Sequence, residues 1–335
     1  MEQLLFLCGM TLVPTAIVGL IALILMQKVL RRTICRDHEI GEITTLTVYP
    51  PKYSLLTTAK LMTAYERPVD DVMAAWLLDL AVRRYLRICQ RSEAHAGRVA
   101  GYELEILQTI DKLHEEEREV LTGIFDRQEL PVGERLPLEL LRNKAGCRKH
   151  FSSDQSKMEI MMRGQLGLTE QRPEHRRLFG WYMWVLGVLG LLTLSLPLVV
   201  AATQAWYERR RYSLSDKGLA LRRHMLELQR AIASPGDAWA AMLVEAEKQP
   251  ENPDDPGRVV EVSERLLPYA VLYGTAPTEA WASMLENCYI RLQRPPEWFS
   301  KDAFVSPGGF VAAMLDFPWT IRAHMAVPGT RWAVS

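Results

Sequence analysis

The chain has 335 residues, a length that predicts about two folded regions besides any membrane segment. Lys plus Arg and Asp plus Glu both total 40, so net charge gives no electrostatic reason to expect nucleic acid as a partner. The five cysteines are widely spaced and form no Cys-x-x-Cys pair, which favours free thiols over a disulfide framework or a zinc site.

The chain begins with a long uncharged segment. Residues 4–26 carry no charge, and about 23 helical residues are enough to cross a hydrocarbon core of about 30 Å. The start Met1-Glu2-Gln3 lacks the basic residues of a cleaved signal peptide. We therefore predict a transmembrane helix over residues 4–27, kinked at Pro14.

Basic residues follow this segment, among them Lys28, Arg31 and Arg32, whereas only Glu2 precedes it. The positive-inside rule then predicts an outer N-terminus and a cytoplasmic location for residues 28–177. Residues 28–54 form the expected juxtamembrane linker.

Residues 55–165 are expected to form a small winged-helix-like cytoplasmic domain. Two helices are predicted, the second opened by Pro68 with one apolar face made of Val69, Val72, Met73, Trp76 and Leu80. Alternation at residues 86–89 and again at residues 102–106 predicts a β-hairpin. Further helices follow, and the order helix, helix, hairpin, helix is typical of a winged-helix module.

A second uncharged block occupies residues 178–207, with aromatic residues at both ends (Trp181, Tyr182, Trp184, Trp206 and Tyr207). Aromatic belts at both ends favour a single membrane span. Basic residues on both flanks instead favour a short re-entrant hairpin that turns near Ser195-Leu196-Pro197. The sequence leaves both alternatives open.

The last third of the chain is expected to be helical over residues 208–300 and irregular over the aromatic-rich tail, residues 301–335. Ser215 can cap a helix whose buried face holds Leu221, Met225, Leu228 and Ile232. A helical pair is expected over residues 259–292, broken at Gly274 and Pro277.

No catalytic, cofactor-binding or metal-binding residue is predicted. The chain has no nucleophile elbow, Walker loop, dinucleotide-binding glycines or His-Glu-x-x-His motif, so we expect a protein without enzymatic activity or a cofactor. Tyr49, Asp79 and Tyr269 are explained as buried or capping residues. The basic cluster of Arg83, Arg84, Arg87 and Arg91 is explained as a solvated charged surface. The acidic run of Glu115, Glu116, Glu117 and Glu119 is explained by its place at the start of a helix, where carboxylates complement the helix dipole.

Three stretches carry a family resemblance: Tyr49-Pro50-Pro51 with residues 69–88, then residues 117–125, then residues 267–274 with Trp281 and Trp298-Phe299. Together they resemble the YciQ-like bacterial membrane proteins, domain of unknown function family 2207. The resemblance implies a bacterial inner-membrane protein with cytoplasmic helical regions and no established molecular function. We expect the chain to lack the family's usual secreted N-terminal domain. Arg84 stands where the family usually has a glycine with positive φ, so we expect a cost of about 1 kcal/mol or a shifted helix end.

The resulting fold class is a mainly α membrane protein with an N-terminal transmembrane helix, a winged-helix-like domain, a central span or hairpin and a C-terminal helical region. Its expected function is that of a membrane-anchored scaffold or interaction protein, and the alternative is a membrane-tethered winged-helix DNA-binding or signalling regulator. Other proteins are expected partners, and nucleic acid is not. Anionic lipid headgroups are expected near the basic residues Lys28, Arg31, Arg32, Arg209, Arg210 and Arg211. The side of the C-terminus and the oligomeric state do not follow from the sequence.

Overall fold

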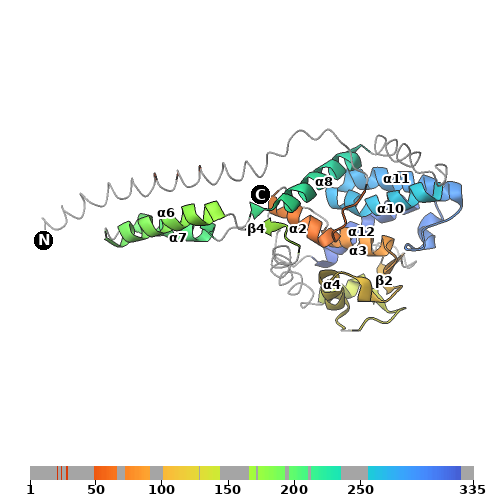
Figure 1. The fold of residues 1–335 in the computed structure, drawn as a ribbon. Coiled ribbons are helices and arrows are strands. Elements are labelled where there is room, and N and C mark those ends of the chain that lie inside the picture. The colour runs from red at the N-terminus through yellow and green to blue at the C-terminus, as the bar shows by residue number, and fades with distance from the viewer. Residues whose placement is uncertain are drawn as a thin grey trace. The chain divides into compact units, whose positions relative to one another are not determined.

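The computed structural model describes residues 49–65, 72–90, 101–127, 129–143, 166–170, 173–192, 196–209, 213–234 and 256–325, together with Ile21, Ile24 and Lys28. The chain forms two compact units. Unit 1 holds residues 1–42 and 161–220, and unit 2 holds residues 43–160 and 221–335. The described part is mainly helical (Figure 1).

Unit 2 is built around helix α3 (Val72–Val82). Nearly every side chain of α3 is buried, because α2 (Leu55–Tyr65), α10 (Pro256–Tyr273) and α12 (Gly309–Met325) pack against it. Figure 1 shows α10 and α11 (Thr275–Leu292) on one side of α3 and the small sheet with α4 (Glu115–Phe125) on the other. A helix that is apolar on all sides needs this central position.

The sheet of unit 2 has three antiparallel strands in the order β1 (Leu86–Gln90), β2 (Tyr102–Ile106) and β3 (Arg135–Pro137). Leu86 pairs with Ile106 and Ile88 with Leu104, so the hairpin predicted from the alternating pattern is confirmed. The free edge of β1 is covered by the C-terminal half of the chain: the Ile88 N–H donates to the Trp298 carbonyl (2.9 Å), and the Ser300 N–H donates to the Ile88 carbonyl (2.9 Å). Short 3-10 turns η1 (Ile110–Lys112), η2 (Leu138–Asn143) and η3 (Lys301–Phe304) complete the connections.

These contacts correct the predicted winged-helix-like module. Residues 55–143 do not enclose a core of their own, because α3 has apolar side chains on the faces that α10 and α12 cover. The core therefore joins the first and last thirds of unit 2. Sequence periodicity had identified only one apolar face, made of Val69, Val72, Met73, Trp76 and Leu80, of which Met73, Trp76 and Leu80 are buried in α3 and Val69 lies outside the described residues.

Helix α12 corrects the predicted irregular tail. Its buried residues Phe310, Met314, Phe317 and Ile321 follow the helical spacing i, i+4, i+7 and i+11. Pro318 lies inside the helix, and glycines precede it, so local helix-breaking residues obscured the period. Packing against α3 and α11 stabilises the helix in spite of them.

The backbone of Arg84, just after α3, is left-handed. Strain or a shifted helix end was expected here, because the YciQ-like proteins have a glycine at this position. Arg84 has φ 67°, its N–H donates to the Ala81 carbonyl (2.8 Å), and the Tyr85 N–H donates to the Leu80 carbonyl (2.9 Å). This pair of hydrogen bonds is a Schellman motif, so the helix ends in place and Arg84 adopts the strained conformation. Its guanidinium also pairs with the buried Glu264 carboxylate at 3.4 Å.

Unit 1 contains a helical hairpin of α6 (Pro173–Leu192) and α7 (Leu196–Arg209). A two-stranded ladder of β4 (Thr169–Glu170) and β5 (Ser213–Leu214) joins the two ends of the hairpin. After β5, helix α8 (Asp216–Ala233) begins, capped by Ser215 as predicted: the Gly218 N–H donates to Ser215 Oγ (3.2 Å).

The predicted fold class and location in the bacterial inner membrane are wrong. Among the described residues, none of the helices is both long enough and apolar enough to cross a bilayer. Helix α6 has 20 residues, but Arg176 and Arg177 leave an uncharged stretch of about 15 residues, or roughly 22 Å, against a core of about 30 Å. Helix α7 has 14 residues and is also too short.

The predicted central block, residues 178–207, is thus divided between two short helices that pack on each other rather than one span. The predicted transmembrane helix over residues 4–27, apart from Ile21 and Ile24, lies outside the described residues. The predicted topology, with residues 28–177 in the cytoplasm, depended on that helix and is not kept.

Candidate functional site

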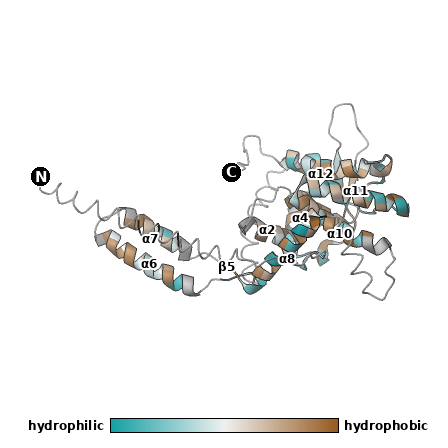
Figure 2. Ribbon diagram, turned by 90° about the horizontal axis from the view of Figure 1, so that it is seen from above, coloured by the Kyte–Doolittle hydropathy of each residue, from teal (hydrophilic) through white to brown (hydrophobic). Residues whose placement is uncertain are grey.

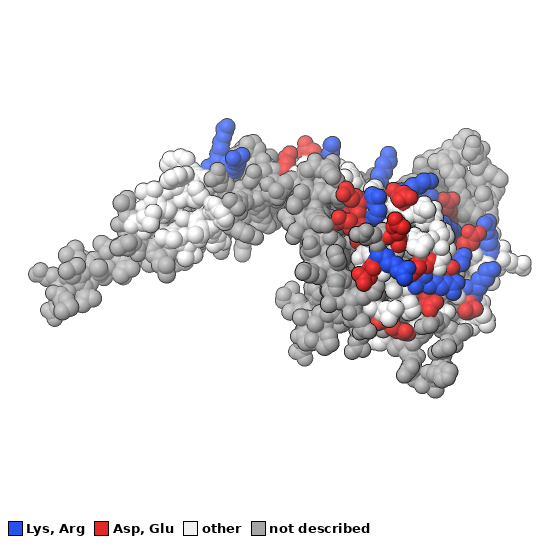
Figure 3. All heavy atoms as spheres, turned by 90° about the horizontal axis from the view of Figure 1, so that it is seen from below, with Lys and Arg blue, Asp and Glu red and all other residues white. Residues whose placement is uncertain are grey.

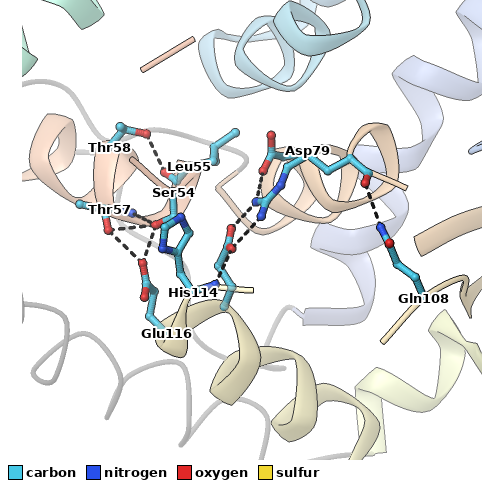
Figure 4. Close-up of polar contacts among 10 residues, drawn as sticks. Ser54, Leu55, Thr57, Thr58, Asp79, Gln108, His114 and Glu116 are labelled. Carbon is cyan, nitrogen blue, oxygen red and sulfur yellow. Dashed lines mark hydrogen bonds and ion pairs between the residues drawn. The ribbon is translucent and has the colours of Figure 1, made fainter. Parts of the chain in front are cut away.

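Two features of the described residues were compared as candidate sites: a polar cluster in unit 2 and the helical hairpin of unit 1. The polar cluster lies where α2, α3 and α4 meet (Figure 4). The Arg83 guanidinium, just after α3, donates to both carboxylate oxygens of Glu117 (2.7 and 3.2 Å) and to Asp79 (3.1 Å). Glu117 is fully buried, in the first turn of α4, and also accepts the His114 N–H (3.3 Å).

The neighbouring carboxylate of Glu116 ties α4 to the start of α2. Ser54 Oγ donates to Glu116 Oε1 (2.8 Å) and accepts the Thr57 N–H (3.2 Å), so Ser54 also caps α2. Figure 4 shows Ser54, Thr57 and Glu116 pointing toward one another. The acidic residues at the start of α4 were expected only to complement the helix dipole. Through Glu116 and Glu117 they also bind Ser54, just before α2, and Arg83, just after α3.

The protonation of this cluster is shifted by burial. Burial raises the pKa of Asp79 to about 6; Arg83 opposes this shift and Glu117 adds to it. Burial also raises the pKa of the Tyr269 hydroxyl well above its usual value, and Asp79 adds to that shift. Tyr269 and Glu117 are buried, and the polar atoms of the cluster bind one another. This arrangement holds α2, α3 and α4 together.

The raised pKa of Asp79 predicts that the stability of the fold depends on pH. The pKa of Asp79 is about 6 in the folded state and 3.8 in the unfolded state, so protonation of Asp79 stabilises the fold at low pH. This stability is lost as the pH rises through 6. Asp79 is faced by Arg83, Glu117, His114 and Tyr269. We expect Asp79 to lower the free energy of unfolding by up to about 3 kcal/mol between about pH 4 and about pH 7. Urea titrations should show a smaller fall over this window in Asp79→Asn, and an unchanged fall would contradict the assignment.

Three arginines of the basic cluster near the end of α3 are engaged by carboxylates. Arg83 pairs with Asp79 and Glu117, Arg84 pairs with Glu264, and Arg87 pairs with Glu105 at 3.4 Å. Arg91 lies outside the described residues. Figure 3 shows Lys and Arg interspersed with Asp and Glu on the face of unit 2 that it presents. The described arginines of the cluster and the face shown in Figure 3 therefore form no continuous basic surface for DNA.

The second candidate, the helical hairpin of unit 1, is apolar rather than charged. Its inner core is small and apolar: Phe179 and Leu186 on α6 pack with Leu198, Ala201, Ala202 and Ala205 on α7. Figure 2 shows apolar residues, coloured brown, along both helices. Because the helices are short, many apolar side chains remain outside this core.

Four of these exposed side chains share one face of α6, which we call the tryptophan face: Trp181, Trp184, Val188 and Leu191. Their spacing is i, i+3, i+7 and i+10, and their exposed fractions are 75%, 69%, 45% and 73%. Contiguous exposed apolar surface of this kind marks an interaction site in a folded protein. We take the tryptophan face as the candidate functional site.

Close approach of α6 and α7 depends on a glycine near the turn. A Cβ added at Gly190 would lie 3.0 Å from Val199 Cγ2 and 3.1 Å from the Val199 backbone nitrogen. At Gly187, one turn earlier, an added Cβ would lie 3.9 Å from Ala202 Cβ, an ordinary contact. Both glycines thus face α7, but only at Gly187 is there space for an added methyl group.

These distances predict opposite effects of two similar substitutions. Gly187→Ala should raise the free energy of unfolding of the hairpin by up to about 1 kcal/mol, because Ala favours helix. Gly190→Ala should lower it by about 1 kcal/mol or more, because the two helices must separate. Hydrogen exchange of the α6 and α7 amides would measure both effects. Equal stabilisation by the two substitutions would show that α6 and α7 do not approach as described.

Of the residues discussed in the sequence analysis, Asp79 and Tyr269 meet in the buried cluster, whereas Tyr49 is half-exposed and its carbonyl oxygen lies 2.8 Å from His224 Nε2. Trp181 and Trp184 were interpreted as a membrane aromatic belt, and Gly190 was missed. Lys28 is exposed, whereas Arg31, Arg32, Arg210 and Arg211 lie outside the described residues. The described residues contain no group of three or more His, Cys, Asp or Glu side chains placed to hold a metal ion.

Comparison with known proteins gives no relative for either site. The chain matches no protein-family model, no curated protein and no solved structure. The resemblance to the YciQ-like proteins thus gains no support from these comparisons, and the functional argument depends on the residues alone.

Proposed function

We propose that the protein acts as an interaction or scaffold protein that binds helical segments of partner proteins on the tryptophan face of α6. The observation that supports this proposal is the exposure of Trp181, Trp184 and Leu191, each at least two-thirds accessible. Tryptophan is the residue most enriched among the side chains that dominate protein–protein affinity. An exposed pair of them one turn apart is a costly surface unless a partner covers it.

The shape of the surface favours a helical partner. The backbone groups of α6 and α7 are hydrogen-bonded within their own helices, so the hairpin offers no strand edge for an extended peptide. Side chains at spacing i, i+3 and i+7 form ridges that accept the ridges of another helix. Two antiparallel helices are also half of a four-helix bundle, which a helical partner can complete.

A nucleic-acid regulator is less well supported. Arg83, Arg84 and Arg87, three of the four arginines that suggested it, pair with carboxylates of the same unit, and the tryptophan face carries no charge. Phosphate binding depends on free Lys and Arg. The tryptophan face instead suits apolar contact.

Site-specific photocrosslinking tests the proposal. A photoreactive amino acid at Leu191 is expected to yield an adduct with a helical segment of a partner protein, and the adduct should weaken when Trp184 is replaced by Ala. The control position is Thr203, which is exposed on α7 and lies outside the tryptophan face. An adduct of equal yield at Thr203, or one that Trp184→Ala leaves unchanged, would contradict binding at this face.

A further inference from the structure

We infer, resting on the proposed function, that the partner helix is amphipathic and carries an acidic residue at one end, which Arg177 of α6 binds. Arg177 lies one turn before Trp181 and is exposed. It continues the line of the tryptophan face toward the start of α6 and adds a positive charge at that end. We call the five side chains together the extended face: Arg177, Trp181, Trp184, Val188 and Leu191.

The extended face has the spacing of a coiled-coil seam. From Arg177 to Leu191 the steps between its side chains are 4, 3, 4 and 3 residues. This alternation repeats every seven residues, the period at which two helices stay in contact while they wind around each other. The face is about 21 Å long, so a partner helix of about 15 residues matches it.

Charge on the hairpin is confined to one end. Among the described side chains of α6 and α7, only Arg176 and Arg177 are charged, and both lie near the start of α6. In the sequence, residues 172–177 hold three arginines and one glutamate, whereas residues 178–207 hold no charge. Figure 3 shows blue side chains at one end of the hairpin and white ones along the rest of its described surface. A complementary partner therefore carries negative charge at the matching end.

An acidic residue opposite Arg177 fixes how the partner lies on α6. A single charged residue in a coiled-coil seam specifies the register, because only one register places it beside its counterion. An apolar side chain at that place would cover the guanidinium without an acceptor, which is costly. A helix with an acidic end is thus selected over a helix that is apolar along its whole seam.

Charge also argues against a second copy of this chain as the occupant. If two α6 helices paired in parallel, Arg177 would meet the same residue of the other copy, and like charges repel. If they paired antiparallel about Trp184, Arg177 would meet Leu191, beside the uncharged turn of the hairpin. Neither pairing of α6 with itself brings a described acidic side chain of the hairpin to Arg177. A different helix supplies the missing charge.

Two designed peptides test the inference on the full chain. Each peptide is a fluorescent, covalently locked helix with leucines at the spacing of the tryptophan face. One carries Glu one turn beyond the leucines at both ends, and the other carries Lys at the same positions, so either orientation is sampled. Fluorescence anisotropy at low salt should show that the Glu peptide binds about fivefold more tightly, the upper end for an exposed ion pair. Salt at about 0.5 M should reduce this difference.

Arg177→Glu is the informative variant, and Arg176→Glu is its matched control. Arg177→Glu should reverse the preference, so that the Lys peptide binds more tightly. Arg176 lies about 100° around the helix from Arg177 and off the extended face, so Arg176→Glu should keep the preference for Glu. Both side chains are exposed, so both variants should fold. Equal affinities of the wild-type chain for the two peptides, or a preference that Arg177→Glu leaves unchanged, would overturn the inference.

Trp184→Ala separates this result from the proposed function. If both peptides bind equally and Trp184→Ala weakens both, the inference fails and the proposed function stands. If neither peptide binds, the inference fails, and photocrosslinking at Leu191 decides the proposed function separately. Binding of the chain to anionic lipid vesicles in place of the peptides, or a dimer that Trp184→Ala dissociates, would also overturn the inference and assign the face to lipid or to a second copy.

Discussion

Replacing Arg83 with Met is expected to lower the free energy of unfolding by about 3 kcal/mol, the lower end of the range for breaking a buried ion pair. The substitution leaves the fully buried Glu117 carboxylate without the cation 2.7 Å away, and leaves Asp79 without its partner at 3.1 Å. The lower end applies because the Arg83 side chain is 30% exposed. Urea unfolding at neutral pH would measure the change.

Two variants complete that experiment. Arg127→Met removes an exposed pair with Glu134 at 3.2 Å and should cost less than about 1 kcal/mol. Replacing Arg83 and Glu117 together with apolar residues should restore part of the stability, because the fully buried Glu117 carboxylate is then no longer left without a cation. If Arg83→Met costs no more than Arg127→Met, the cluster does not hold α3 to α4.

Gly218→Ala is expected to lower the free energy of unfolding by about 2 to 3 kcal/mol. Its added Cβ would overlap the Leu168 carbonyl oxygen and press on Leu214 Cδ2 at 3.0 Å. The oxygen is a backbone atom at the stem of the hairpin, where it also accepts the Ser215 N–H (3.0 Å), so it has little freedom to move. Overpacking of this kind outweighs the helix propensity that Ala adds.

The control for Gly218→Ala is Ser215→Ala, which removes the cap of α8 without a clash and should cost about 1 kcal/mol. Hydrogen exchange at the β4–β5 ladder would show whether the stem opens in Gly218→Ala. Retention of wild-type stability and protection would mean that the stem is not packed as described.

Local patterns were the best guide to the fold. Alternation at Leu86, Ile88 and Leu104 predicted the hairpin, and Ser215 predicted the start of α8. Gly274 marked the break between α10 and α11. Each of these signals acts within a few residues, where backbone preferences decide the structure.

Long-range contacts could not be read in the same way. The pairing of Arg83 with Glu117 joins residues 34 apart, and that of Arg84 with Glu264 joins residues 180 apart. Helix α12 was missed because its stability comes from packing on α3 and α11, which compensates for Pro318. No local pattern contains this information.

The sequence predicted no site on α6, although it drew attention to two of the residues that form one. Trp181 and Trp184 stood out at the edge of an uncharged block, which hydropathy alone cannot distinguish from a membrane span. The block is divided into two helices of 20 and 14 residues, and their contact needs Gly190. Exposure of the tryptophans, which follows from the short helices, is visible only in three dimensions.

The most direct test of the proposed function is the affinity of the partner captured at Leu191 for the wild-type chain and for Trp184→Ala. We expect the Kd to rise by at least about tenfold, since an exposed tryptophan at the centre of an interface contributes more than about 1.4 kcal/mol. Thr203→Ala, on the other helix, should leave the Kd unchanged. A Trp184→Ala variant that binds as tightly as the wild-type chain would contradict the tryptophan face as the binding site.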